Sequence, residues 1–247
     1  MRLSIIIPVL NSHEVLRRQL INFEKIGLPA ETELILVDDG SDPSIENTSS
    51  LPVTILQTHD TRPWTWALAR NVGARVAKGD QLLMYDLDHI VTYDLLHFVL
   101  RHDEPRIHFR REFGVLDETG VLRKDWETLR SYGLTMHRKR IESHHNSFAM
   151  KRDLFWKLGG YREDLIGNPY PQGEDSDFYR KWVAYSHKTC IPSCEGPTLY
   201  VFPTGRFCGD VDFNPHGLFH DLSRKSTWNY WWNRQRNQEC QPALQKT

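Results

Sequence analysis

Two short acidic segments carry the residue types that catalytic chemistry uses most often. The first is Asp86-Leu87-Asp88, in which two carboxylates lie two positions apart directly after an apolar run. In an extended chain, side chains two positions apart point to the same side. Two converging carboxylates repel each other without a cation, and their hard oxygen atoms suit Mg²⁺ or Mn²⁺. A surface loop with solvated acids is the alternative, because a motif of three residues is short.

The second acidic segment is Gly173-Glu174-Asp175-Ser176-Asp177. A carboxylate held beside a bound hydroxyl group can take its proton during attack, so this segment could supply a general base. The apolar spacing that follows predicts a helix over Glu174–Ser186, and acids in the first turn of a helix are also stabilised by its dipole. The residues alone leave both interpretations open.

Strands and helices alternate along the first hundred residues, and this order predicts a mostly parallel sheet with right-handed crossovers. Apolar runs predict strands at Leu3–Val9, Glu33–Val37, Val53–Gln57 and Gln81–Tyr85. Helical spacing predicts a helix capped by Asn11 and Ser12, and further helices over Trp66–Ala77 and Tyr93–Leu100. Ligands of such sheets bind beyond the carboxyl ends of the strands, which is where Asp38-Asp39 and the Asp86–Asp88 segment lie.

The second half of the chain is less regular. It predicts strands near Ile107–Phe109, Lys188–Ile191 and Thr198–Phe202, and helices within Lys124–Met136, over Asp153–Leu158 and over Leu218–Arg236. The chain shows no repeat, low-complexity segment or Gly/Ser linker. We therefore expect one domain over residues 1–247, with residues 1–100 as a nucleotide-binding half and residues 101–247 as an acceptor half.

Composition excludes some classes of protein. The 247 residues include 31 Lys and Arg against 32 Asp and Glu, a balance that does not favour nucleic-acid binding through bulk positive charge. Basic strings at Arg101–Arg111 and His137–His145 nevertheless leave an anionic acceptor open. Four cysteines and the lack of an apolar run of about 18 residues predict a cytoplasmic protein without a transmembrane segment. The aromatic segment around Trp228–Trp232 leaves peripheral membrane contact open.

The order of the short motifs resembles glycosyltransferase family 2. The nucleotide-binding half shows Ser4-Ile-Ile-Ile-Pro8 with Asn11, Val37-Asp-Asp-Gly-Ser41, Ala69-Arg-Asn-Val-Gly73, Gly79-Asp80 and Asp86-Leu-Asp88. The acceptor half shows Asn146-Ser147, Leu158-Gly-Gly-Tyr161 and Gly173-Glu-Asp175. The resemblance implies a GT-A fold, which is an α/β fold with a mixed, mostly parallel sheet flanked by helices. It also implies a nucleotide-sugar donor, with UDP the usual nucleotide, and inversion at the anomeric carbon.

The resemblance also implies a role for each matched residue. Pro8, Asn11, Asp39, Arg70 and Asp86 would bind the nucleotide, with Asp39 at the base and Asp86 near the ribose. Asp88 and Asp86 would bind Mn²⁺ or Mg²⁺, with a downstream histidine as a further ligand, for which His220 is preferred to His216. Asp175 would be the catalytic base, and Glu174 would bind or orient the acceptor. His89 is a further candidate ligand, although its side chain should point away from Asp88 if the strand continues.

These residues predict a metal-dependent inverting glycosyltransferase whose acceptor is a saccharide or a lipid-linked saccharide. A hydroxymethylated base of viral or phage DNA is an alternative acceptor. A nucleotide-sugar-binding protein without catalysis is an alternative of another class, although Asp86, Asp88 and Asp175 argue against it. A nucleotidyltransferase is less favoured, because Pro8–Glu14 offers no Gly-rich phosphate loop.

Overall fold

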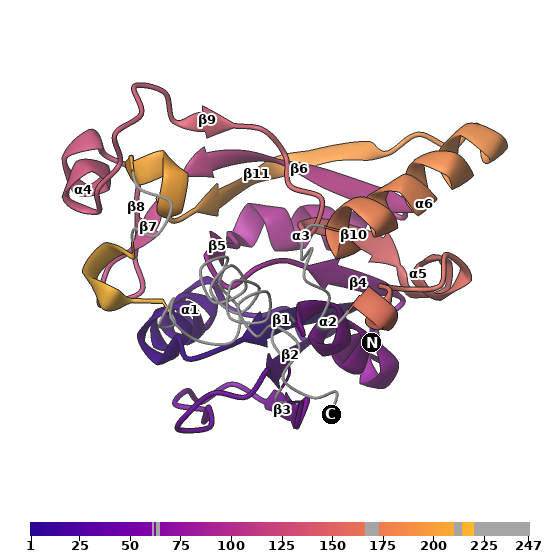
Figure 1. The fold of residues 1–247 in the computed structure, drawn as a ribbon, viewed down its shortest axis with the longest axis horizontal. Helices are drawn as coiled ribbons and strands as arrows, with labels where there is room; N and C mark the ends of the chain where they lie inside the picture. The colour runs from indigo at the N-terminus through magenta and orange to yellow at the C-terminus, as the bar shows by residue number, and fades with distance from the viewer. Residues whose placement is uncertain (61, 63–64, 166–172, 210–213, 220–247) are drawn as a thin grey trace, which may run out of the picture.

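The first four strands of the structure, a computed structural model, form the parallel part of one large sheet (Figure 1). The structure describes residues 1–60, 62, 65–165, 173–209 and 214–219. The strands are β1 (Leu3–Val9), β2 (Thr32–Asp38), β3 (Val53–Gln57) and β4 (Gln81–Met84). They lie in the order β3-β2-β1-β4, and every neighbouring pair is parallel, as predicted.

The second half of the chain continues the same sheet with antiparallel pairs and a parallel pair. β10 (Phe148–Lys151) pairs antiparallel with β4 and with β6 (Arg106–Phe113), and β11 (Cys194–Val201) lies parallel to β6. The short strands β5 (His89–Ile90) and β9 (Arg140–Ile141) pair antiparallel with β11 and β6. The sheet is therefore mixed and runs through both halves, which confirms the predicted fold class.

The alternation of side chains along the central strands assigns helices to the two faces of the sheet. Ile5 and Ile7 of β1 belong to one core cluster, while Ile6 belongs to the other. The first cluster includes apolar residues of α1 (His13–Ile26) and α3 (Tyr93–Arg101), and the second those of α2 (Trp66–Val76), α5 (Arg152–Lys157) and α6 (Glu174–Thr189). Figure 1 shows α1 on one side of the strands and α2 on the other. A strand covered on both faces needs the continuous apolar run seen in β1.

Two glycines of the family-like motifs let neighbouring elements approach β1 closely. A Cβ added to Gly73 of α2 would lie 2.5 Å from Cγ2 of Ile6, and one added to Gly79 would lie 2.5 Å from the backbone nitrogen of Ser4. The Gly79 N–H also donates to Ser4 Oγ over 2.8 Å. These motif positions therefore serve packing, which sets where α2 stands above the sheet.

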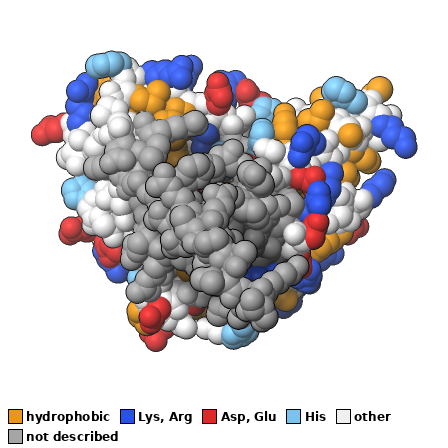
Figure 2. All heavy atoms as spheres, in the orientation of Figure 1, with side chains coloured by type: hydrophobic (Ala, Val, Ile, Leu, Met, Phe, Trp, Pro, Cys, Tyr) orange, Lys and Arg blue, Asp and Glu red, His pale blue; other side chains and the backbone are white. Residues whose placement is uncertain are grey.

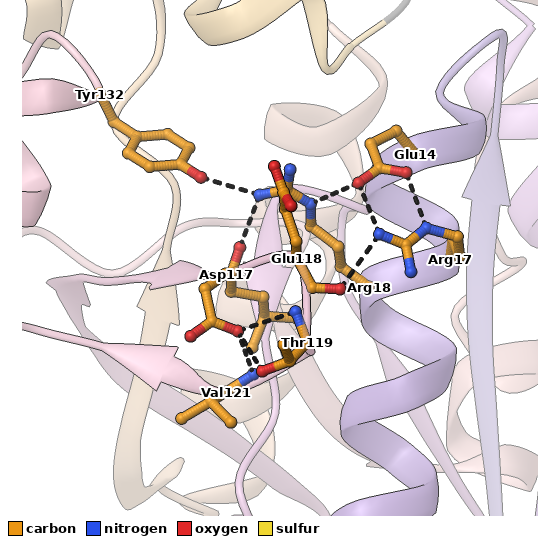
Figure 3. Close-up of polar contacts among 9 residues, drawn as sticks. Glu14, Arg17, Arg18, Asp117, Glu118, Thr119, Val121 and Tyr132 are labelled. Carbon is orange, nitrogen blue, oxygen red and sulfur yellow. Dashed lines mark hydrogen bonds and ion pairs between the residues drawn. The ribbon is translucent and has the colours of Figure 1, made fainter.

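A small hairpin docks onto α1 through a buried arginine (Figure 3). The hairpin strands are β7 (Val115–Leu116) and β8 (Leu122–Arg123), followed by α4 (Trp126–Ser131). Arg18 of α1 donates to the carbonyl of Leu116 over 2.9 Å, to the hydroxyl of Tyr132 over 2.8 Å and to Glu14 over 2.8 Å. These contacts hold the hairpin and the end of α4 against the helix.

Two predicted elements and one predicted cap differ from the structure. Lys188–Ile191 is not a strand, because α6 continues through Thr189 and ends at Cys190 in the left-handed region with φ 56°. The predicted helix over Leu218–Arg236 lies outside the described residues except at its first two positions. Ser12 occupies the N-cap of α1, but its hydroxyl donates to the Leu10 carbonyl instead of capping the helix, and Asn11 serves the loop before it.

The remaining described elements are three short 3₁₀ turns at Glu163–Leu165, Gly205–Cys208 and Pro215–Gly217. In the part of the chain that is described, no helix is both long enough and apolar enough to cross a lipid bilayer.

Candidate active site

The turn that carries the first acidic motif is held from three sides. Directly after β4, the chain turns so that the His89 N–H donates to the Asp86 carbonyl over 2.9 Å. Gln19 of α1, which is fully buried, donates from its side-chain amide to the carbonyls of Leu87 and His89. The N–H of Phe202, just beyond β11, donates to the Asp88 carbonyl over 2.8 Å. The turn therefore has a fixed backbone before any ligand binds.

This turn brings three potential ligand atoms together. One ligand atom each from Asp86, Asp88 and His89 lie within 4.8 Å of one another. The expected convergence of the two carboxylates is therefore seen. His89 was expected to point away from Asp88 if the strand continued, but β4 ends at Met84 and the chain turns, so the two side chains meet. His89 Nδ1 lies 2.8 Å from Asp88 Oδ1.

Asp86 is bound by two cationic or polar partners from other elements. Its Oδ1 forms an ion pair with Arg70 of α2, and its Oδ2 lies 3.4 Å from Nδ1 of His144. Burial alone would raise the pKa of Asp86, but the nearby Arg70 and His144 outweigh it and lower the pKa below its ordinary value. Asp86 is therefore ionised, and both of its oxygens face partners within the protein.

Asp88 is more open than Asp86. Its side chain is 28% exposed, and Oδ1 is bound to His89. Its second oxygen, Oδ2, forms no hydrogen bond or ion pair with the residues that the structure describes. Asp88 is therefore the carboxylate with an oxygen available to a divalent cation, and the donor set of hard oxygens fits Mn²⁺ or Mg²⁺.

Arg70 links the first acidic motif to the second. Its side chain is fully buried, and its guanidinium carbon lies 5.5 Å from the centre of the Tyr161 ring. Burial alone would lower the pKa of Arg70. The interaction with Asp86 opposes burial most strongly, and the pKa is raised overall. Smaller contributions in the same direction come from Tyr161, Glu174 and Asp175. The two acids that begin α6 therefore contribute, with Asp86, to the electrostatic environment of Arg70.

The three acids at the start of α6 differ in their surroundings. Glu174 is buried at 6% exposure, and Asp175 is half-buried with its Oδ1 accepting from the Ser176 N–H over 2.6 Å. Asp177 is bound to Lys181 one turn later over 3.0 Å. Asp177 therefore has a local ion-pair role, while Glu174 and Asp175 belong to the charged group around Arg70.

A hydrogen-bonded support joins α2 to the residues of the acceptor half. The side-chain amide of Asn71 donates to the Tyr161 carbonyl over 2.8 Å and accepts from the Tyr161 N–H over 3.0 Å. The Tyr161 hydroxyl donates to Asn146 Oδ1 over 3.0 Å. Asn71, Asn146 and Tyr161 all come from the family-like motifs, so those motifs mark the frame around Arg70 as well as its acidic neighbours.

The residues expected around the nucleotide base lie at the carboxyl edge of β1 and β2. Asp39 is buried at 1% exposure and accepts from Thr58 Oγ1 over 3.0 Å and from Thr65 Oγ1 over 2.6 Å. Asn11, with φ 48°, donates from its N–H to Ser41 Oγ over 2.9 Å and accepts from the Asp42 N–H over 2.7 Å. The loops after the two strands are therefore joined beside Asp39.

Pro8 fits its place in β1 for a reason of geometry. The Val9 carbonyl accepts from the Asp39 N–H, so the backbone groups of Val9 face β2, and those of Pro8 face the opposite side. On that side, pairing with β4 has already ended at Ile6. The missing N–H of proline therefore costs no ladder hydrogen bond.

The two histidines considered as downstream metal ligands have different outcomes. His220 lies outside the described residues. His216 is not part of the acidic cluster. Its Nε2 lies 3.2 Å from the Ser131 carbonyl, and its ring packs edge-on against Tyr132 with centroids 4.5 Å apart.

Two arginines of the basic strings in the acceptor half are paired with acids. Arg110 pairs with Glu195 of β11, and Arg140 pairs with Glu112 over 3.0 Å. Figure 2 shows acidic and basic side chains lying next to one another in several places on the face that it draws. These arginines therefore do not add up to a patch of uncompensated positive charge.

Some site residues could not be found from the sequence. His144 lies two positions before the Asn146-Ser147 motif, within a basic string, and that proximity was the only available signal. Gln19, Thr65 and Arg111 gave no signal, because their partners lie far away in the sequence. Arg111 Nη1, for example, lies 3.3 Å from His89 Nε2.

Comparisons with known proteins agree with this geometry. The profile of the family described as Glycosyl transferase family 2 matches residues 4–159, which is more than half of the chain. Glu174 and Asp175 lie beyond the matched range. A search of curated proteins finds no significant match.

Several solved structures share the fold. S. aureus TarS 1-349 has a TM-score of 0.54 at 18% identity, covering 82% of this chain and 61% of that one. Its complex with UDP has a TM-score of 0.54 at 19% identity, covering 80% and 57%. Mannosyltransferase PcManGT from Pyrobaculum calidifontis in complex with GDP-Man and Mn²⁺ has a TM-score of 0.52 at 20% identity, covering 83% and 58%. This chain therefore spans about three fifths of the length of each of these chains. The family profile covers more than half of the chain, and the solved structures share its fold, so the chain belongs to glycosyl transferase family 2.

Proposed function

We propose that this chain is a metal-dependent, inverting glycosyltransferase that moves a sugar from a UDP-sugar to a hydroxyl group of a saccharide or lipid-linked saccharide. The observation that carries the proposal is the ion pair of the fully buried Arg70 with Asp86, in the turn where ligand atoms of Asp86, Asp88 and His89 converge. Asp175, at the start of α6, also helps to raise the pKa of Arg70. Both observations support a donor site and a base that act on the same sugar.

The proposed donor site combines Asp39 with the loops after β1 and β2. The two threonine hydroxyls orient the Asp39 carboxylate at the carboxyl edge of β1 and β2. A carboxylate accepts hydrogen bonds, and the group that it would take from the donor is the N–H of a uracil ring. UDP is preferred as the nucleotide because a TarS structure with this fold holds UDP. Pro8, Asn11 and Arg70 would complete the nucleotide site.

The proposed metal site rests on Asp88, with Asp86 toward the ribose. Asp88 has an available oxygen, whereas Arg70 and His144 face both oxygens of Asp86. A divalent cation held there, Mn²⁺ or Mg²⁺, would stabilise the charge that develops on the departing diphosphate. His220 is proposed as a further ligand from the end of the chain.

The proposed base is Asp175. It would take the proton of the acceptor hydroxyl as that oxygen forms a bond to the anomeric carbon. The bond from that carbon to the diphosphate breaks on the opposite face, so one displacement inverts the configuration. Glu174, which is buried next to Asp175, would orient the acceptor.

A neutral or lipid-linked saccharide fits the acceptor half better than DNA does. Nucleic-acid binding draws most of its affinity from cations that neutralise phosphates. Arg110 and Arg140 are already paired with Glu195 and Glu112. We accordingly propose an acceptor in the cytoplasm or at a membrane surface.

The test is a panel of nucleotide sugars incubated with Mn²⁺, with and without a saccharide acceptor, followed by detection of the released nucleotide. We expect release from a UDP-sugar, loss of release with EDTA and recovery when Mn²⁺ is restored. The anomeric configuration of the product, read by proton NMR, should be opposite to that of the donor. UDP binding without turnover on any donor would favour a non-catalytic binder, and turnover that resists EDTA would contradict the metal site.

A further inference from the structure

We propose that His89 orients the Asp88 carboxylate as a hydrogen-bond donor and does not bind the metal, and that Arg111 sets the ring tautomer that makes this possible. The inference rests on the proposed function, because it concerns the same metal site. It differs from a simple interpretation of the cluster, in which Asp86, Asp88 and His89 all ligate one ion.

Both ring nitrogens of His89 face a partner. Nδ1 lies 2.8 Å from Asp88 Oδ1, and Nε2 lies 3.3 Å from Nη1 of Arg111. A guanidinium group can only donate, so Nε2 must be the acceptor. The carboxylate can only accept, so the proton of the ring lies on Nδ1. The contacts thus assign a neutral ring with Nδ1–H.

This tautomer removes His89 from the set of metal ligands. A histidine binds a metal through an unprotonated nitrogen, and the unprotonated nitrogen here faces Arg111. A divalent ion at Nε2 would lie next to a permanent positive charge. Arg111 is itself buried at 8% exposure and is held by a hydrogen bond of 2.7 Å from its Nε to the Glu142 carbonyl.

The backbone of His89 is also fixed, so the ring is not free to turn toward a different partner. His89 pairs with Val201 in the short antiparallel ladder between β5 and β11, and its carbonyl accepts from Gln19. Its side chain is 2% exposed. A rotation that freed Nδ1 would break the contact with Asp88 inside a packed region.

The consequence is a role in positioning. The bond from Nδ1–H occupies Oδ1 of Asp88 and leaves Oδ2 for the cation, so His89 holds the carboxylate for binding through one oxygen. Arg111 reaches this site from β6 in the acceptor half. Partners of this kind, which hold a ligand without touching the metal, typically change metal affinity by about 10- to 100-fold when removed.

The first experiment measures Mn²⁺ affinity by EPR in the presence of UDP for the wild type and three variants. His89→Leu removes the donor, and we expect affinity to fall about tenfold or more. His89→Asn keeps an N–H near the position of Nδ1, and we expect affinity within about threefold of wild type. His97→Ala, in α3, is the control and should bind Mn²⁺ as the wild type does. Equal large losses in His89→Leu and His89→Asn would overturn the proposal.

The second experiment asks directly whether a His89 nitrogen touches the ion. Pulsed EPR detects ¹⁴N nuclei bonded to Mn²⁺, and we expect the same ¹⁴N signal in the wild type and in His89→Asn, whether it is zero or comes from another histidine. A ¹⁴N signal that is present in the wild type and lost in His89→Asn would overturn the proposal.

The third experiment needs no metal and separates this inference from the proposed function. Long-range ¹H–¹⁵N NMR of the metal-free wild type should show His89 protonated at Nδ1 only, and Arg111→Met should shift the ring toward a mixture of tautomers. A wild-type ring protonated at Nε2 overturns the inference even if Mn²⁺ binds. If the wild-type ring is protonated at Nδ1 but the protein binds no Mn²⁺ in the presence of UDP, both the positioning role of His89 at a metal site and the metal-dependent function are overturned.

Discussion

Arg70 and Asp86 form an ion pair between α2 and the turn that follows β4, and the Arg70 side chain is fully buried. A buried charge that loses its partner is strongly unfavourable, because the attraction between the two charges is what offsets their removal from water. Asp86 therefore has two roles in this molecule, one as a candidate ligand for the donor and one as the counter-charge of a buried guanidinium. Asp88, two positions later, has no comparable structural duty.

This difference predicts that substitutions of the two aspartates have different effects on the stability of the fold. Asp86→Asn should lower the free energy of unfolding by about 3–5 kcal/mol, because it leaves Arg70 buried without its partner charge. Asp88→Asn should change the free energy of unfolding by no more than about 1 kcal/mol, because it loses one bond at a partly exposed position. Urea unfolding of the metal-free proteins measures both values. Similar losses in the two variants would mean that the ion pair with Arg70 does not carry this stability.

A second prediction concerns the base. Asp175→Asn should keep the affinity for UDP within about threefold and lower kcat by about 10²- to 10⁴-fold, because only proton removal from the acceptor is lost. Asp177→Asn is the matched control in the same helical turn. Asp177 pairs with Lys181, so its variant should retain transfer within a few-fold. Turnover like that of the wild type in Asp175→Asn would remove Asp175 from the role.

The sequence was sufficient to predict the fold of the nucleotide-binding half, because the strands there follow local patterns. The apolar runs of β1, β2 and β4 are buried on both faces, so strand identity, parallel order and the carboxyl edge could all be inferred from the pattern. The convergence of Asp86 and Asp88 was also inferable, although a turn produces it rather than an extended strand.

The rest depends on contacts between distant residues. Gln19 contacts Leu87 and His89, which follow it by 68 and 70 residues in the sequence. Arg111 contacts His89, from which it is separated by 22 residues. No periodicity marks such contacts. The short strands β5 and β9 of two residues each exist only because β11 and β6 offer an edge, so propensity could not predict them.

A third prediction tests the close approach of α2 to the sheet. Gly73→Ala should destabilise the protein by about 1–3 kcal/mol, because the new Cβ would overlap Cγ2 of Ile6 at 2.5 Å. The higher helix propensity of alanine, about 1 kcal/mol, opposes this loss only in part. The double variant with Ile6→Ala is the control, since it removes the clashing atom, and Gly73→Ala should cost less there. A stabilised single variant would contradict the close packing.

The last prediction concerns pH and the network that docks the hairpin to α1. The pKa of Glu14 is lowered from 4.5 to about 2, mainly by the hydrogen bond that Arg17 donates to its carboxylate. Burial opposes this shift, and a second hydrogen bond, from Arg18, adds to it. A carboxyl whose folded pKa is depressed contributes stability above its unfolded pKa and loses it as the pH falls through the folded value.

Glu14→Gln should therefore lower the Tm at pH 7 by a small amount, since pairs as exposed as this one contribute about 0.2–1 kcal/mol. The gap from the wild type should stay constant down to about pH 5, narrow below 4.5 and close near pH 2. Thermal unfolding from pH 7 to pH 2 measures the gap, with Glu31→Gln, an exposed glutamate, as the control. A gap that does not depend on pH would show that the charge of Glu14 does not carry the docking of Arg17 and Arg18.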